Sequence, residues 1–178
     1  KLDPLSLRTK TLTAWMHYQA HRFDEALAIT RQMLELDKNY PQGYLQSGMA
    51  LWGLKSYEEA LRSFRAFDRM IPESALAQYK LCFGLVAAGE TAQARRVLGD
   101  MQERAAAGYV KPYFLAMAHV AVGDRDRAFE YFEQSYDEHE PWLIWFGTEP
   151  MLESLHDDAR YVELLERMNN PIVERYKK

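Results

Sequence analysis

The sequence predicts an all-α protein, a right-handed α-solenoid of about four helix pairs with capping helices at its C-terminal end. An alanine recurs every 34 residues, at positions 26, 60, 94 and 128, and a period of this length is typical of stacked helical hairpins. Apolar residues in each segment repeat every three or four positions, as on the buried face of a helix. Gly89 and Gly123 stand at matching places between predicted helices, where glycine adopts a positive φ at little cost.

Short stretches around the recurring alanine are similar from unit to unit, at residues 23–27, 56–61, 90–94 and 124–129. In these stretches the sequence resembles the tetratricopeptide repeat (TPR), whose unit is a pair of antiparallel helices. The resemblance covers most of the chain. It implies a domain that binds proteins or peptides, and it does not identify the partner.

The period also sets the expected domain organisation. We expect a single TPR domain over residues 1–178. Because the opening residues Lys1–Pro4 match the end of a repeat, we expect the chain to be a fragment of a longer protein. The expected repeats lie at about 7–40, 41–74, 75–108 and 109–142, and a capping unit follows at 143–178.

Two features within the repeats are expected to fix the helices locally. Ser6 is the expected N-cap of the first helix, and Ser56 followed by Glu59 is typical of a capping box. One position in each first helix is always small, which would let the paired helices approach closely. These positions are Ala14, Gly48, Cys82 and Ala116.

The period stops after the fourth repeat, where the apolar stretch 141–147 is followed by segments 149–155 and 157–168. This order resembles the terminal unit of repeat regions in bacterial signalling proteins, such as those attached to winged-helix regulators, nucleotide cyclases and serine/threonine kinases. The resemblance implies a bacterial signalling or regulatory protein, and a unit that caps the exposed end of the solenoid. From Pro171 onward we expect a short, basic, frayed tail.

The first helices of the pairs are expected to line a concave groove. The residues that spacing directs into this groove are mostly apolar or aromatic, and an apolar surface of this extent usually marks an interface. We therefore expect the groove to bind an apolar or amphipathic segment of a protein or peptide partner. The predicted groove residues are Thr11, Trp15, Tyr18, Leu45, Met49, Trp52, Tyr79, Phe83, Val86, Tyr113 and Met117.

Two other interpretations of this groove stay open. A TPR variant clamps the C-terminal carboxylate of its partner with Lys, Arg and Asn. Those residue types are absent from the groove positions, so a receptor of that kind is not expected. The groove residues could instead be covered by the chain itself, with Trp142 and Trp145 folded back, or they could form the interface of a homodimer.

Composition limits the remaining classes of function. The net charge of −4 disfavours nucleic-acid binding, and no apolar run approaches the roughly 20 residues of a membrane helix. Cys82 is the single cysteine and is expected to be a buried, inert thiol. His17 and His21 lack a third ligand, so no metal site is predicted, and no catalytic or cofactor-binding residues are evident. We therefore expect a binding module and not an enzyme; the compartment is left open, with the cytoplasm preferred.

Overall fold

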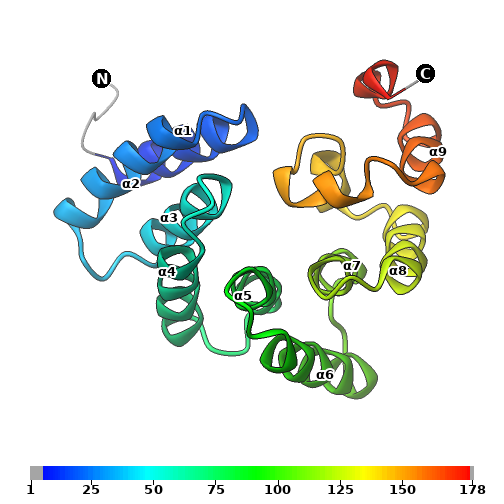
Figure 1. Ribbon diagram of the computed structural model, residues 1–178, viewed down its shortest axis with the longest axis horizontal. Coiled ribbons are helices and arrows are strands. Elements are labelled where there is room, and N and C mark those ends of the chain that lie inside the picture. Colours follow the sequence, from blue (N-terminus) through cyan, green and yellow to red (C-terminus); the bar gives the residue numbers. More distant parts are fainter. Residues whose placement is uncertain (1–5, 177–178) are drawn as a thin grey trace.

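The computed structural model describes residues 6–176, which form the predicted stack of helix pairs. In Figure 1 the pairs follow one another around an arc, with α3, α5 and α7 on its inner side and α4, α6 and α8 outside. The all-α solenoid fold is thereby confirmed. The expectation about Lys1–Pro4 lies outside the described residues. The pairs are α1 (Leu7–Gln19) with α2 (Phe23–Leu36), α3 (Pro41–Gly53) with α4 (Tyr57–Met70), α5 (Ala75–Ala87) with α6 (Thr91–Ala107), and α7 (Pro112–Ala121) with α8 (Arg125–Asp137).

Small residues hold the two helices of a pair close together. The recurring alanine is fully buried in the outer helices, as Ala60, Ala94 and Ala128 illustrate. On the facing inner helix, a Cβ atom placed on Gly48 would lie only 2.5 Å from a ring carbon of Phe64. Cys82 occupies the same position one repeat later, and burial raises the pKa of its thiol to about 12, so the thiol stays protonated and inert.

Gly48→Ala is expected to destabilise the protein because its new methyl group has no space beside Phe64. Overpacking of this kind typically costs about 1–3 kcal/mol. Gly99 in α6 is the matched control, because an added Cβ would meet nothing within 4 Å, and Gly99→Ala should stabilise its helix by roughly 0.5–1 kcal/mol. Urea unfolding of the two variants measures both effects. Equal midpoints would contradict this account of the position that is small in every first helix.

Ser6 and Ser56 stand at the N-cap positions of α1 and α4 as predicted, but the predicted capping hydrogen bonds are wrong, because neither side chain accepts one. Ser56 donates its backbone N–H to the carbonyl oxygen of Leu51, near the end of the preceding helix, at 2.9 Å. Its ψ of 62° is also far from the extended conformation usual for an N-cap. Side-chain caps occur instead at Ser74 and Asp124, which accept from the N–H groups of Ala77 and Arg127.

Beyond α8 the chain continues as η1 (Pro141–Trp145), η2 (Pro150–Leu155), α9 (Ala159–Arg167) and η3 (Pro171–Arg175). Helix α9 packs against α8. Arg160 and Arg167 of α9 form ion pairs of 2.8 and 2.6 Å with acidic residues of α8, and the Arg160 guanidinium lies 4.4 Å from the ring centre of Phe129. Helix α9 therefore covers one side of the last helix pair.

The tail from Pro171 is folded as far as it is described, so the expectation of fraying is wrong there. Val173 in η3 is buried, and the ring of Tyr176 packs edge-on against that of Tyr161 at 5.3 Å. Apolar residues in the tail supply the contact area that a frayed end would lack. Within residues 6–176, no helix has the length and apolar character needed to cross a bilayer.

Candidate functional site

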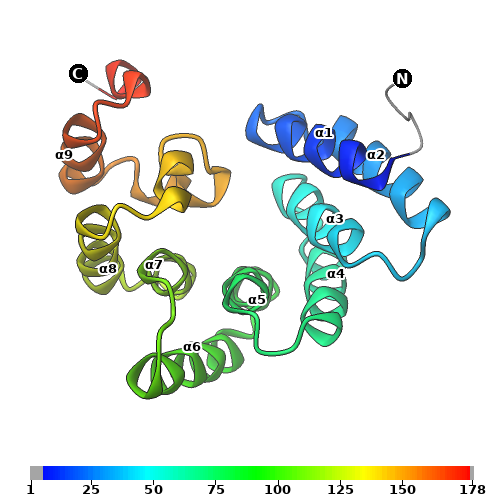
Figure 2. The same cartoon turned by 180° about the vertical axis from the view of Figure 1, so that it is seen from behind.

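The inner face of the arc is occupied in part by the chain's own C-terminal segment, residues 141–155. Figures 1 and 2 show this segment, in yellow to orange, on the inner side of the arc between α7 and α1. Phe146, Leu152 and Leu155 are fully buried. The ring centres of Trp145 and Trp15 lie 4.2 Å apart, which joins the segment to the first helix. The segment is thus part of the hydrophobic core.

This segment contributes to two separate openings among the predicted groove residues. Tyr18 and Met117 are fully buried beneath the surface. The first opening, a pocket of about 350 Å³, includes the predicted residues Thr11, Trp15, Leu45, Met49, Tyr79 and Tyr113. The second includes the predicted residues Trp52, Phe83 and Val86, together with Met151, Glu153 and Ser154 of the segment.

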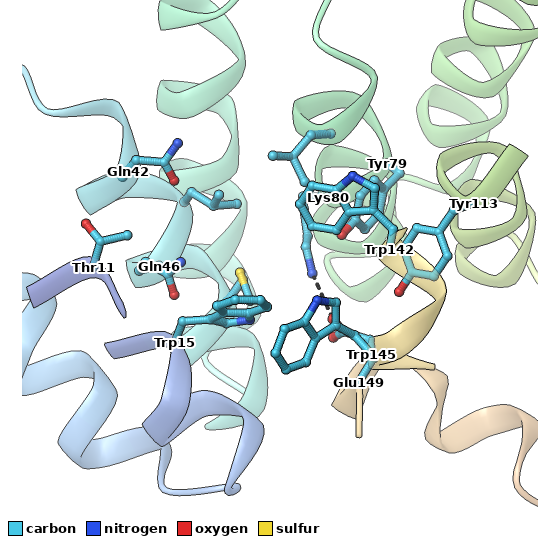
Figure 3. A pocket seen from close by; sticks show the side chains of 13 residues that line it. Thr11, Trp15, Gln42, Gln46, Tyr79, Lys80, Tyr113, Trp142, Trp145 and Glu149 are labelled. Carbon is cyan, nitrogen blue, oxygen red and sulfur yellow. Dashed lines mark ion pairs between the residues drawn. The ribbon is translucent and has the colours of Figure 1, made fainter. Parts of the chain in front are cut away.

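The first pocket has an aromatic side and a polar side. Figure 3 shows Thr11, Gln42 and Gln46 on one side, and Tyr79, Tyr113 and Trp142 opposite. Trp142 is held by Tyr113 and Phe114, whose ring centres lie 6.4 and 5.3 Å from its own. Gln42 and Leu76, which spacing places at the rim of the groove, also line the pocket, as do Trp142 and Trp145, which one interpretation of the sequence folded back onto the groove. Three further lining residues were not predicted, namely Gln46, Lys80 and Glu149.

A buried ion pair lies at the inner end of this pocket. Lys80 Nζ is 3.6 Å from Glu149 Oε2, and both side chains are almost completely buried. The hydroxyl of Tyr18 donates to Glu149 Oε1 at 2.5 Å, and the N–H of Met151 donates to the same oxygen at 3.3 Å. Burial lowers the pKa of Lys80, while the Glu149 carboxylate acts in the opposite direction. The carboxylate thus ties α1, α5 and the C-terminal segment together.

One feature of the sequence could have identified two of the pocket-lining residues that were not predicted. Gln46 and Lys80 are 34 residues apart and stand next to the groove positions Leu45 and Tyr79. Both are polar, although their helices are largely buried, and an interior polar residue needs a partner or a function. No comparable signal marks Glu149, because it lies outside the repeats.

Burial of three phenols predicts that the protein loses stability at alkaline pH. Burial, followed by the charge of Glu149, raises the pKa values of Tyr18, Tyr79 and Tyr113 well above 10.0. In the unfolded chain these phenols ionise near their usual pKa, so above about pH 10 the folded state binds more protons and its stability falls. Lys80 acts in the opposite direction, since its pKa is lowered, whereas the raised pKa of the Cys82 thiol adds to the loss of stability.

This pH dependence can be measured as the urea midpoint between about pH 8 and about pH 11, with tyrosinate absorbance recorded alongside. The midpoint should fall most steeply above about pH 10, where ionisation of the three phenols in the unfolded chain adds to that of the Cys82 thiol, which begins at about pH 8.5. The three phenols should ionise only with unfolding. Ionisation of all tyrosines at ordinary pKa values in the folded protein would contradict the prediction.

The histidines lie apart from the pocket. His21 occupies the turn between α1 and α2 with a φ of 56°. His119 is buried and lies 3.2 Å from both Asp124 and Gln102. In the part of the chain that the structure describes, no group of three or more His, Cys, Asp or Glu side chains is placed to hold a metal ion.

The stacked antiparallel pairs and their small-residue contacts define a TPR-type α-solenoid. Among solved structures, the chain is similar to TPR-like repeats of a candidate kinesin light chain from Podospora anserina. The two share 17% identity with a TM-score of 0.55, over 97% of this chain and 92% of that one.

It is also similar to MamA, from residue 41 to the end, of Desulfovibrio magneticus RS-1, with 19% identity and a TM-score of 0.52. That match covers 100% of this chain and 99% of the other. No protein-family model matches the sequence, and no curated protein is significantly similar to it. At these identities the likeness establishes the TPR fold alone.

Proposed function

We propose that the chain is a protein-interaction module that binds a peptide segment of a partner protein in the aromatic pocket of its inner face. The single observation that supports this most is the pocket itself, about 350 Å³ in volume and lined largely by apolar and aromatic side chains. A volume of this order is usual for ligand sites. The proposed role is binding without chemistry, as a scaffold or sensor of a bacterial signalling protein.

The C-terminal segment limits what can bind. Because residues 141–155 occupy part of the inner face, a long amphipathic helix would not fit along the whole arc. A partner can instead place one or two anchor side chains between Trp15 and Trp142, both of which remain partly exposed. Aromatic pockets of this kind commonly supply most of the affinity in peptide recognition.

The second candidate function is homo-oligomerisation. Leu12 and Met16 lie one turn apart on α1 and are 57% and 54% exposed. An exposed apolar pair at the end of a solenoid could contact a second copy of the chain. Light scattering over a range of concentrations separates the two functions, because a stable dimer would favour assembly, whereas a monomer favours a free binding face.

The binding proposal is tested with peptides selected from a random phage-displayed library. Leu76 lines the pocket at the second position of α5, so Leu76→Glu places a carboxylate in the pocket wall. Ala92 is exposed at the second position of α6 and gives a matched control, Ala92→Glu. Both new carboxylates lie at helix N-termini, where the helix dipole favours them.

We expect Leu76→Glu to weaken binding of the selected peptides at least about tenfold, since the charge would be desolvated on binding. Ala92→Glu should bind as the unmodified protein does. Circular dichroism checks that both variants stay folded. If no peptide is enriched, or if both variants bind equally well, the pocket is not the binding site.

A further inference from the structure

We propose that the pocket receives an indole or phenol side chain of the partner peptide, and that Gln46 accepts a hydrogen bond from its N–H or O–H group. This inference rests on the proposed function, because it names the anchor residue that the binding module recognises. It follows from three properties of the pocket: its aromatic side, its internally neutralised charge and its one buried amide without a partner.

The charges that line the pocket neutralise each other. Lys80 is the basic side chain in its lining and Glu149 the acidic one, and they pair at 3.6 Å. The lining phenols of Tyr79 and Tyr113 stay protonated, because burial raises their pKa values. A charged anchor would lose its hydration without gaining an opposite charge. The pocket therefore favours a neutral side chain.

Gln46 is the side chain in the pocket that needs a hydrogen-bond donor. Its side chain is only 6% exposed, and its Oε1 atom has no hydrogen-bond partner among the described residues. By contrast, Thr11 bonds to the Leu7 carbonyl and to Tyr40, and Gln42 is partly exposed to water. A buried acceptor without a donor is costly, so an occupant that brings a donor gains affinity.

The amide of Gln46 can turn its oxygen toward such a donor. None of its atoms is held by a hydrogen bond to a described residue, and the terminal torsion of glutamine has broad, roughly two-fold preferences. Rotation of the amide therefore breaks no existing hydrogen bond. Tryptophan and tyrosine combine a large apolar body with a donor at the tip, which matches an aromatic pocket with one acceptor. Phenylalanine lacks the donor, and serine lacks the apolar body.

The experiment compares two blocked amino acids that differ by one hydrogen-bond donor. N-acetyl-tryptophanamide carries an indole N–H, whereas its 1-methyl analogue does not. We expect the first to bind about fivefold more tightly by ligand-observed NMR, the ratio that one net hydrogen bond gives. Equal affinities, tighter binding of the methylated analogue, or binding of neither compound would overturn the proposal. Tighter binding of free indole would overturn its assignment to a peptide.

Two substitutions on the same helix locate the donor's partner. Gln46→Met keeps the length of the side chain and removes the acceptor, so the fivefold preference should disappear. Gln42→Met, one turn earlier on α3, should keep the preference. Thermal melting gives a second readout, because Gln46→Met removes an unpaired buried amide and should not lower the melting temperature. A preference that survives Gln46→Met would overturn the role of Gln46, and a misfolded variant would leave the comparison of the two analogues decisive.

This result is distinguishable from failure of the proposed function. If selected peptides depend on Leu76 but the protein does not distinguish the two analogues, the binding module stands and the anchor assignment fails. If the peptides are indifferent to Leu76→Glu, the proposed function itself fails.

Discussion

Ala60→Glu is expected to unfold the whole solenoid. Ala60 has no exposed surface and lies on α4, where the outer helix packs against the small residues of the inner helix. A carboxylate there would reach neither water nor a partner, and the cost of several kcal/mol approaches the roughly 5–15 kcal/mol stability of a typical domain. We expect loss of most helical circular dichroism at room temperature, whereas the exposed Ala92→Glu stays folded.

Unfolding of Ala60→Glu should be global and not local. In an open array each repeat contacts only its neighbours, so damage can stay within a few repeats. Here the C-terminal segment contacts α1 through Trp145 and Glu149, so the first and last parts of the chain depend on each other. A variant that keeps a cooperative transition near the original melting temperature would contradict both the burial and the coupling.

Lys80→Met is expected to lower the free energy of unfolding by roughly 3–5 kcal/mol, the usual effect of leaving one partner of a buried ion pair without its counter-charge. The substitution preserves side-chain length but leaves the Glu149 carboxylate buried, with Tyr18 and a backbone N–H as its remaining donors. Adding Glu149→Gln should restore much of this loss, because the double variant has no buried charge and Tyr18 can still donate to the amide oxygen.

Urea unfolding of the two single variants and the double variant measures the coupling between these residues. Arg62→Met provides the control, because the Arg62–Glu59 pair has side chains that are 67% and 59% exposed, and exposed pairs contribute little. Strictly additive effects of Lys80→Met and Glu149→Gln would show that the two charges do not interact in the folded protein.

The sequence predicted the parts of the structure that repeat. The 34-residue period identified the helix pairs. The small residue at one position of every first helix predicted the close approach of the paired helices, seen where Gly48 meets Phe64. Spacing also selected the inner face, and six of the residues it directed there line one pocket. The helix pairs and the close contact at Gly48 could be predicted because they depend on contacts between positions that are close in sequence or one period apart.

The remaining features depend on contacts that no period describes. Tyr18 and Glu149 are 131 residues apart, and residues 141–155 form short 3₁₀ helices without an amphipathic repeat. Their position on the inner face is therefore set by tertiary packing of Phe146 and Leu152. The Glu59 half of the capping box expected at Ser56 failed for a local reason, since the Ser56 N–H that Glu59 would accept from already donates to Leu51 of α3.

The contact of Tyr18 with Glu149 has a mechanical consequence. A solenoid stretched from its two termini ordinarily extends like a spring, because no link bridges its ends. In this chain the hydroxyl–carboxylate contact and the Trp15 and Trp145 rings, tilted at 58° to each other, bridge α1 and the C-terminal segment, so a force that separates α1 from this segment would load them. Stretched by optical tweezers, the molecule should resist until this bridge ruptures and then lengthen in one large step.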